Sequence, residues 1–520
     1  MSTRLSQNDS QVAKSAGVIG ALTSVSRVLG FIRDMVIAAV FGTGLGAEAF
    51  VVSFKIPNLL RDLVGEGAAN AAFVPVLTEC KEKHPERFWS LAAALFRSMA
   101  LVLIILSLLG VFFTPQIVAL IAPGFLDSPD PEKFPLTVRL TRVIFPYIFL
   151  IGLSALAMGI LNALKEFKSS AFGPALLNLS LIVAGCYFES SHGPMALVVG
   201  VLVGGALQLG CQLIPLFRRG FRFSPADAGG DYARKIGKLL LPRAFGSALY
   251  QINVFVDSIL ASFERFVGPG GQSALYYSNR IFQLPLAIFG LSLAQALLPT
   301  FSTQMVREDL EGFRGTFSAA MRSLMFIVIP ASVGLTVLSE TIVRTLFEAG
   351  RFDAYSTGIT SSALFYYSFG LLSCCFIKIL VNVFYAMQDT RTPVKTMLVS
   401  VAFNIVMSLL LMGPLKIGGL ALASTLSATL NFALLYRVLK KKFGTLGGSR
   451  ILKAGLRMCL AGMVMALAAW AFDHALMARC AEASRVVQFI VLAVGIAVLA
   501  AIYFFSARLL GVEESRKFFS

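Results

Sequence analysis

Residues 53–71 read SFKIPNLLRDLVGEGAANA, and residues 278–296 read SNRIFQLPLAIFGLSLAQA. Six positions are identical at a spacing of 225 residues, and a seventh holds a cation in both stretches, Lys55 and Arg280. Both cations lie inside long apolar segments, where a charge costs at least ~2.5–3.5 kcal/mol on insertion scales. A chain that carries one in each half of a duplicated body is expected to face both into a cavity, which predicts a transporter for an anionic substrate.

The composition indicates an integral membrane protein. The chain has 520 residues, of which 57% are hydrophobic and 14% are charged, and its mean hydropathy is +0.77. Ordinary soluble domains carry about 25% charged residues. Roughly 20 apolar residues cross a bilayer as a helix. We expect about fourteen transmembrane helices, beginning near residues 16, 47, 91, 136, 171, 194, 235, 272, 316, 357, 393, 417, 453 and 486.

The net charge of +17 is unevenly distributed among the connections. Assigning the connections alternately to the two sides of the membrane places 30 of the 45 Lys and Arg on the side that holds both termini, and 8 on the other. This imbalance follows the positive-inside rule, so both termini are predicted to be cytoplasmic. Because membrane orientation accounts for most of the basic charge, nucleic-acid binding is not expected.

Cysteine, histidine and short motifs indicate neither a metal site nor an enzyme. The seven Cys include no CxxC pair, and the three His are scattered over predicted connections. The sequence has no GxSxG, Walker or HExxH motif. The polar residues 1–14 precede an apolar run that charges interrupt, so no cleavable signal peptide is predicted. We expect no catalytic residues and no cofactor.

The duplication extends well beyond the quoted stretches. Six predicted helices separate the copies, and because six is even, both copies enter the membrane in the same orientation. The predicted fold is an all-α polytopic membrane protein with two parallel-repeat six-helix lobes, residues 1–225 and 226–445, and two additional transmembrane helices in residues 446–520. A cleft between the lobes is the expected substrate site. The matching positions are Asp34 with Asp257, Phe145, Tyr147, Phe149 and Asn162 with Phe365, Tyr367, Phe369 and Asn382, and Gly193, Ala196 and Leu197 with Gly418, Ala421 and Leu422.

The first two predicted helices hold the densest intramembrane charge. Arg27 and Asp34 are seven residues apart and therefore share a helix face, with Arg33 to one side. The second helix carries a polar stripe at steps of seven, seven and four residues, which we interpret as a wall of a hydrated cavity. This stripe consists of Glu48, Lys55, Asp62 and Glu66, and it is flanked by Asn58 and Arg61.

A second interpretation is that these charges pair with one another and hold helices together, Arg27 or Arg33 with Asp34, and Arg61 with Glu48 or Asp62. This interpretation explains Arg280 less well, because residues 274–303 contain no acidic residue. An arriving anion would supply the counter-charge. The planar fork of arginine suits phosphate, since it can bond two oxygens at once.

Asp257 is the acidic candidate of the second copy. Exporters coupled to protons or sodium usually need a carboxylate within the membrane, and Asp34, Glu48 and Asp257 qualify. The segment around Asp257 contains no base. Asp257 is therefore interpreted either as a ligand of a coupling ion or as a residue that turns to a buried polar partner, and the choice between Na⁺ and H⁺ is left open.

Several motifs follow one another over nearly the whole chain. They are SRVLGFIRD at 26–34, KIPNLLR at 55–61 with GEGA at 65–68, AFVP at 72–75, APGF at 122–125, GPALLN at 173–178, the Leu-Pro pairs at 284–285 and 298–299, and QDTRTP at 388–393. In these motifs the chain closely resembles the MurJ family, also called MviN. That family comprises lipid II flippases of the multidrug/oligosaccharidyl-lipid/polysaccharide exporter (MOP) superfamily.

The resemblance implies two six-helix lobes with two extra C-terminal helices, which would offer a groove for a polyprenyl tail. It implies carriage of lipid II, the undecaprenyl-pyrophosphate-linked disaccharide-pentapeptide, from the cytoplasmic to the periplasmic leaflet of the bacterial inner membrane by alternating access, for peptidoglycan synthesis. The cell-wall synthesis machinery is a candidate partner. The implied substrate-binding residues, whose cations would meet the pyrophosphate, are Arg27, Arg33, Asp34, Glu48, Lys55, Asn58, Arg61 and Arg280.

Three positions depart from the family pattern. Glu48 stands where many members have Asp, Asn279 stands where an Asp commonly precedes the arginine, and Met387 replaces a frequent basic residue. The missing acid beside Arg280 favours an anion-binding role for that arginine. The alternative functions are a flippase for another polyprenyl-linked saccharide, a cation-coupled drug exporter, which would line its lobes with acids, and a structural scaffold without transport.

Overall fold

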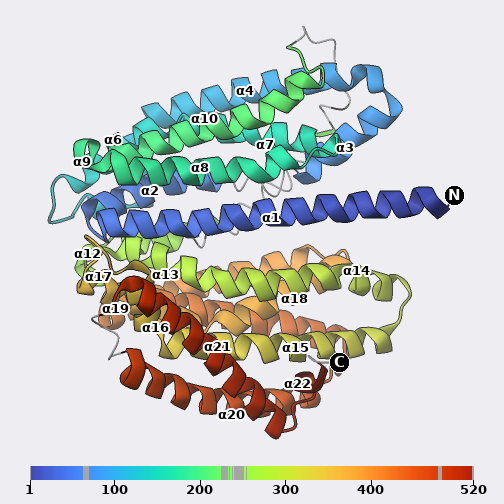
Figure 1. The fold of residues 1–520 in the computed structure, drawn as a ribbon, viewed down its shortest axis with the longest axis vertical. Coiled ribbons are helices and arrows are strands. Elements are labelled where there is room, and N and C mark those ends of the chain that lie inside the picture. Colours follow the sequence, from blue (N-terminus) through green and yellow to red (C-terminus); the bar gives the residue numbers. More distant parts are fainter. Residues whose placement is uncertain are drawn as a thin grey trace. The chain divides into compact units, whose positions relative to one another are not determined.

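The computed structural model describes residues 2–61, 70–223, 232, 235–236, 238, 251–252, 254–477 and 483–517. The chain divides into two compact units, residues 1–263 (unit 1) and residues 264–520 (unit 2). Every regular element among the described residues is a helix, which confirms the predicted all-α fold (Figure 1). The predicted lobe boundary at 225/226 falls outside the described residues and stays a prediction.

Unit 1 consists of long helices that run alongside one another (Figure 1). Within it α8 packs against α1 and α10, and α7 packs against α4 and α10. Residues 254–261 are also helical. The elements are α1 (Ser2–Phe41), α2 (Leu45–Arg61), α3 (Asn70–Lys83), η2 (Pro85–Arg87), α4 (Phe88–Phe112), α5 (Thr114–Ile121), η3 (Pro123–Phe125), α6 (Lys133–Ile144), α7 (Tyr147–Ala163), α8 (Lys168–Tyr187), α9 (Glu189–His192) and α10 (Met195–Arg218).

Unit 2 is a second helical body, in which α15 packs against α20 and α19 packs against α17 and α18. The backbone of α19 is broken at Lys416 (φ 50°, ψ −130°), so its 53 residues form two helices. The elements are α12 (Glu264–Val267), α13 (Gly271–Pro285), η4 (Leu286–Leu291), α14 (Ser292–Val306), α15 (Leu310–Val337), α16 (Ser339–Phe347), α17 (Ala354–Ser368), α18 (Leu371–Ala386), α19 (Arg391–Phe443), α20 (Gly448–Phe472), η5 (Asp473–Met477), α21 (Arg485–Leu509) and α22 (Glu513–Lys517).

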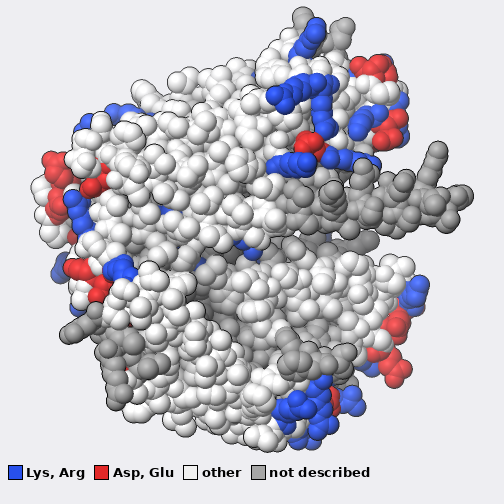
Figure 2. Space-filling model, viewed as in Figure 1, with Lys and Arg blue, Asp and Glu red and all other residues white. Residues whose placement is uncertain are grey.

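Many of these helices are suited to a membrane. Within the described residues, nine helical stretches are long and apolar enough to cross one, and the pair α17 and α18, bent by 48°, raises the number to ten. On the face shown in Figure 2, charged side chains gather at the ends of the helices of each unit and few lie between. These stretches are compatible with the predicted number of about fourteen, part of which falls outside the described residues.

The two units repeat one another in backbone conformation. Lys165 and Gln388, 223 residues apart, both have a φ of 59° and follow the last turns of α7 and α18. At both places the next N–H closes the helix end onto a carbonyl five residues back, from Glu166 to Leu161 at 2.8 Å and from Asp389 to Phe384 at 2.9 Å. This is the Schellman arrangement of helix ends. It supports the predicted duplication independently of sequence identity.

The same two connections carry equivalent ion pairs. Arg219, just after α10, contacts Glu166 at 2.6 Å, and Lys442, at the end of α19, contacts Asp389 at 3.0 Å. Arg219 and Lys442 are 223 residues apart, and so are Glu166 and Asp389. The repeat has therefore kept the position and sign of each charge while the side chains themselves differ.

The connection around Gly193 aligns differently from the prediction. Sequence identity pairs Gly193 with Gly418, whereas the backbone of Gly193 (φ 55°, ψ −142°) matches that of Lys416 (φ 50°, ψ −130°). The reason is that Gly418 serves close packing and not the turn. A Cβ on Gly418 would lie 2.7 Å from the ring of Tyr366.

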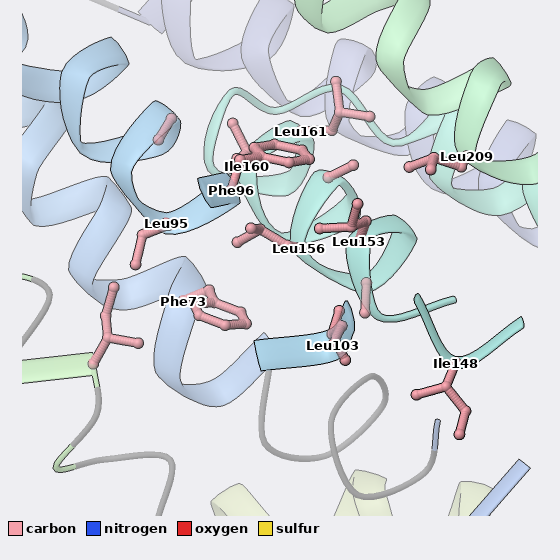
Figure 3. Close-up of a cluster of buried hydrophobic side chains, with 14 of the residues drawn as sticks. Phe73, Leu95, Phe96, Leu103, Ile148, Leu153, Leu156, Ile160, Leu161 and Leu209 are labelled. Atoms are coloured by element: carbon pink, nitrogen blue, oxygen red, sulfur yellow. The ribbon is translucent and has the colours of Figure 1, made fainter. Parts of the chain in front are cut away.

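A hydrophobic core of unit 1 lies among α3, α4, α7 and α10 (Figure 3). Two glycines of α7 make room for large side chains of its neighbours. A Cβ on Gly159 would lie 3.2 Å from Cβ of Phe73, and one on Gly152 would lie 2.5 Å from Cδ1 of Leu103. Small residues of this kind let helices in membranes approach closely.

Candidate functional site

Two of the three charges predicted in the first helix form a buried ion pair. Arg33 and Asp34 of α1 are 7% and 2% exposed. The guanidinium of Arg33 donates from Nη2 at 2.6 Å and from Nε at 3.0 Å to Oδ1 of Asp34. Arg27, almost two turns earlier, is exposed. The α1 charges therefore divide into an internal pair and one accessible arginine.

Asn178 of α8 contacts this pair, although the sequence did not single it out as a site residue. Its Oδ1 accepts a hydrogen bond from Nη1 of Arg33 at 2.9 Å, and its Nδ2 donates to the backbone carbonyl of Ser26 at 3.0 Å. The one available signal was that Asn178 ends the motif at 173–178. A single side chain thus joins α1 and α8 at the charged pair.

Glu48 and Lys133 form a second buried ion pair. Glu48 lies in the first turn of α2 and Lys133 begins α6, and both residues are 2% exposed. Nζ of Lys133 donates to Oε2 of Glu48 and lies 4.5 Å from the ring centroid of Phe125. This burial departs from the expectation that Glu48 lines a hydrated cavity. Its pairing with Arg61 stays a prediction, because the side chain of Arg61 lies outside the described part. A buried carboxylate needs a cation, and this one comes from another helix, 85 residues away.

Lys55 and Asp257 are brought together within unit 1. Lys55 is half-buried in α2 and interacts electrostatically with Asp257, which belongs to the helical residues 254–261. Asp257 thus has a base nearby that its own segment could not supply. Asn58, one turn after Lys55, is also half-buried. Arg61 is the last residue of α2, and its side chain lies outside the described part. Asp62 and Glu66 also lie outside it.

Arg280 lies in α13 of unit 2 and is half-buried. Its Nη2 donates to the hydroxyl of Tyr276 at 3.2 Å, and the guanidinium carbon lies 4.9 Å from the centroid of that ring. Tyr276 stands one turn earlier and so orients the guanidinium from within the same helix. Beyond Pro285 the helix continues into the π-helical turn η4, a feature frequent at functional sites.

The candidate residues fall into two groups. Arg33, Asp34 and Glu48 are buried in internal ion pairs, whereas Arg27, Lys55, Asn58 and Arg280 are exposed or half-buried. Among the described residues, no group of three or more His, Cys, Asp or Glu could hold a metal ion. Long apolar helices, a duplicated backbone and charges retained within them define a polytopic membrane protein of the transporter class.

The profile of a family described as "Lipid II flippase MurJ" matches residues 37–494. The chain belongs to this family. A curated relative from Vibrio cholerae serotype O1, named "Probable lipid II flippase MurJ", is 37% identical over 436 residues, which cover 82% of this chain and 82% of the relative.

Two solved structures are similar in fold. One, titled "Lipid II flippase MurJ, inward closed conformation", has a TM-score of 0.75 at 24% identity and covers 94% of this chain and 98% of that one. The other, an inward-facing multidrug resistance MATE family transporter of the MOP superfamily, has a TM-score of 0.67 at 14% identity and covers 81% of this chain and 96% of that one. The fold is therefore that of MOP superfamily transporters.

Proposed function

We propose that this protein is a flippase that moves lipid II from the cytoplasmic to the periplasmic leaflet by alternating access. The observation that carries the proposal is the extent of the family match, residues 37–494, which runs through both units. The name of the Vibrio cholerae relative supports the choice of substrate. The bacterial inner membrane is the proposed location, with both termini cytoplasmic, because that side then holds 30 of the 45 Lys and Arg.

The pyrophosphate of lipid II is the group that intramembrane cations would bind. Arg27 is exposed and Lys55 and Arg280 are half-buried, so an anion reaches them without first breaking the buried pairs. We assign direct contact with the pyrophosphate to these three residues, and, by the family resemblance, to Arg61. Asn58 would add a neutral hydrogen-bonding group next to Lys55.

The buried charges are assigned a supporting part. Arg33, tied to Asp34, would contribute to the anion site from a fixed position in α1. Glu48, paired with Lys133, would hold the start of α2 against α6 and so position Lys55 two turns further along. Asp257, close to Lys55, would moderate its charge and is the candidate ligand of a coupling ion.

Depletion of the protein tests the function directly. In a bacterial strain that depends on this chain, depletion should stop peptidoglycan synthesis and leave lipid II in the cytoplasmic leaflet. A periplasmic enzyme that cleaves lipid II in intact cells measures which leaflet holds it. Accumulation of a different polyprenyl-linked saccharide would favour that substrate instead, and normal cell-wall synthesis after depletion would favour a scaffold.

A further inference from the structure

The guanidinium of Arg33 is held from two helices at once. Oδ1 of Asp34, its neighbour in α1, accepts hydrogen bonds from Nε and Nη2, and Oδ1 of Asn178 in α8 accepts one from Nη1 at 2.9 Å. Asn178 is 7% exposed, so this contact is largely shielded from water. Hydrogen bonds to charged groups stabilise more than those between neutral groups. The direction of the Arg33 side chain is therefore set jointly by α1 and α8.

The fit between Asn178 and α1 is close on both sides of the amide. While Oδ1 faces Arg33, Nδ2 donates to the carbonyl of Ser26 at 3.0 Å. Gly30 leaves the space that this reach requires, because a Cβ there would lie 3.3 Å from Nδ2. Donor and acceptor of Asn178 are thus both used, so its amide orientation is defined by the contacts it makes.

The charge of the residue at 178 matters as much as its shape. Arg33 and Asp34 together are neutral, and an asparagine accepts the third hydrogen bond without changing that balance. An aspartate would still accept the bond from Arg33, but it would lose the donor to the Ser26 carbonyl and add a second negative charge beside the arginine. Like charges brought together are costly, so that charge would oppose an approaching pyrophosphate.

We propose that Asn178 is a positioning residue for the anion site: it orients Arg33 from α8 without adding a charge beside the Arg33–Asp34 pair. This inference rests on the proposed function, in which Arg33 contributes to pyrophosphate binding. It assigns a role to the 173–178 motif, which joins the 26–34 motif at this contact.

The test uses the full-length protein in detergent with purified lipid II, and it measures two quantities. One is the dissociation constant for lipid II. The other is the rate at which an arginine-specific dicarbonyl reagent modifies Arg33, followed by peptide mass spectrometry with exposed Arg27 as internal reference. The thermal midpoint of each variant shows whether it is folded.

Asn178→Ala should increase the modification rate of Arg33 several-fold and weaken lipid II binding about tenfold, because one hydrogen bond to a charged group is lost. Asn178→Asp should keep Arg33 better protected than Asn178→Ala does, because a carboxylate oxygen still accepts from Nη1, and yet weaken lipid II binding by at least about tenfold through its negative charge. This opposite behaviour in the two measurements is not expected from a residue that only packs.

Asn382→Ala is the matched control. Asn382 of α18 also uses its amide between helices, donating to the carbonyl of Ala294 at 2.7 Å, but it contacts no candidate cation in the described structure. This variant should change neither measurement. Gly30→Ala disturbs Asn178 from the α1 side and should shift both measurements in the direction of Asn178→Ala, which keeps the test open if Asn178→Ala does not fold.

The outcomes separate the inference from the function on which it rests. Equal Arg33 protection in Asn178→Ala, Gly30→Ala and the control would overturn the positioning role. Altered protection with unchanged lipid II affinity would overturn the link between Asn178 and the substrate. If the unchanged protein bound no lipid II, the proposed function would fail, while the reactivity of Arg33 would still decide whether Asn178 orients it.

Discussion

Glu48 and Lys133 have opposite charges, and each residue is only 2% exposed inside unit 1. Removing one partner of such a pair leaves an uncompensated buried charge, at a cost of ~3–5 kcal/mol. Lys133→Ala should therefore lower the free energy of unfolding by about that amount, seen as a large drop in thermal midpoint. The double variant Glu48→Gln, Lys133→Met should recover most of the loss. Equal losses in the single and double variants would contradict the pairing.

Arg280 combines a charge with a defined orientation. Arg280→Ala removes both, and we expect it to abolish complementation of a flippase-depleted strain without reducing the amount of protein in the membrane. Arg280→Lys should restore growth only in part, because a point charge lacks the planar fork and stacks less well on Tyr276. Tyr276→Phe keeps the ring and should stay close to full activity. Normal growth of the Ala variant would argue against an anion site here.

Asp389 lies between α18 and α19, outside the membrane-spanning helices, and contributes to the stability of the folded protein in a pH-dependent way. Burial acts to raise the pKa of Asp389, but hydrogen bonds from Thr392 and Lys442 outweigh it and lower the pKa to about 2. A carboxyl whose pKa is lowered by folding stabilises the folded protein fully at pH values above its pKa in the unfolded chain, ~3.9. This stabilisation is lost as the pH falls through the pKa in the folded protein. The difference in thermal midpoint between the unchanged protein and Asp389→Asn should be constant from pH 8 to pH 5 and shrink only below about pH 4. A difference that already shrinks between pH 8 and pH 5 would contradict this assignment.

At the scale of elements, α8 and α10 pack closely through small residues. A Cβ on Gly204 of α10 would lie 2.8 Å from Cα of Leu177, whereas one on Gly210 of the same helix would meet nothing within 4 Å. Gly204→Ala should therefore destabilise the protein by ~1–3 kcal/mol through overpacking. Gly210→Ala should be neutral or stabilise by up to ~1 kcal/mol, because alanine favours helix. Thermal unfolding of the two variants in one detergent compares them, and equal midpoints would contradict the packing.

For the whole molecule, the proposed transport requires water and then substrate to reach Lys55 and Arg280. In a cysteine-free background, a single Cys at either position should react with a water-soluble thiol reagent, and added lipid II should slow both reactions. Cys at Val494 of α21, which is 57% exposed on an apolar helix, should react poorly because lipid covers it. Protection at one position only would contradict a substrate shared by both residues, and no reaction at either would favour buried ion pairs.

The all-α fold class and the duplication could be predicted because both depend on local features of the sequence. Apolar windows follow the thickness of a bilayer, and the repeat returns polar residues at nearly constant spacing whatever the helices contact. The misalignment of Gly193 with Gly418 arose where identical glycines serve different purposes, a turn in one copy and close packing in the other. Residue identity alone does not distinguish these uses.

Sequence by itself predicted that the charged residues of α1 and α2 and Arg280 of α13 serve an anionic substrate, and this assignment stays a prediction. Only the tertiary structure decided which of them are engaged internally. Arg33 meets Asn178 across 145 residues, and Glu48 meets Lys133 across 85. The physical reason is that burying a charge in a helical membrane protein is tolerated only beside a partner, and the partner is chosen by how helices pack, a long-range property that the periodicity of one helix does not contain.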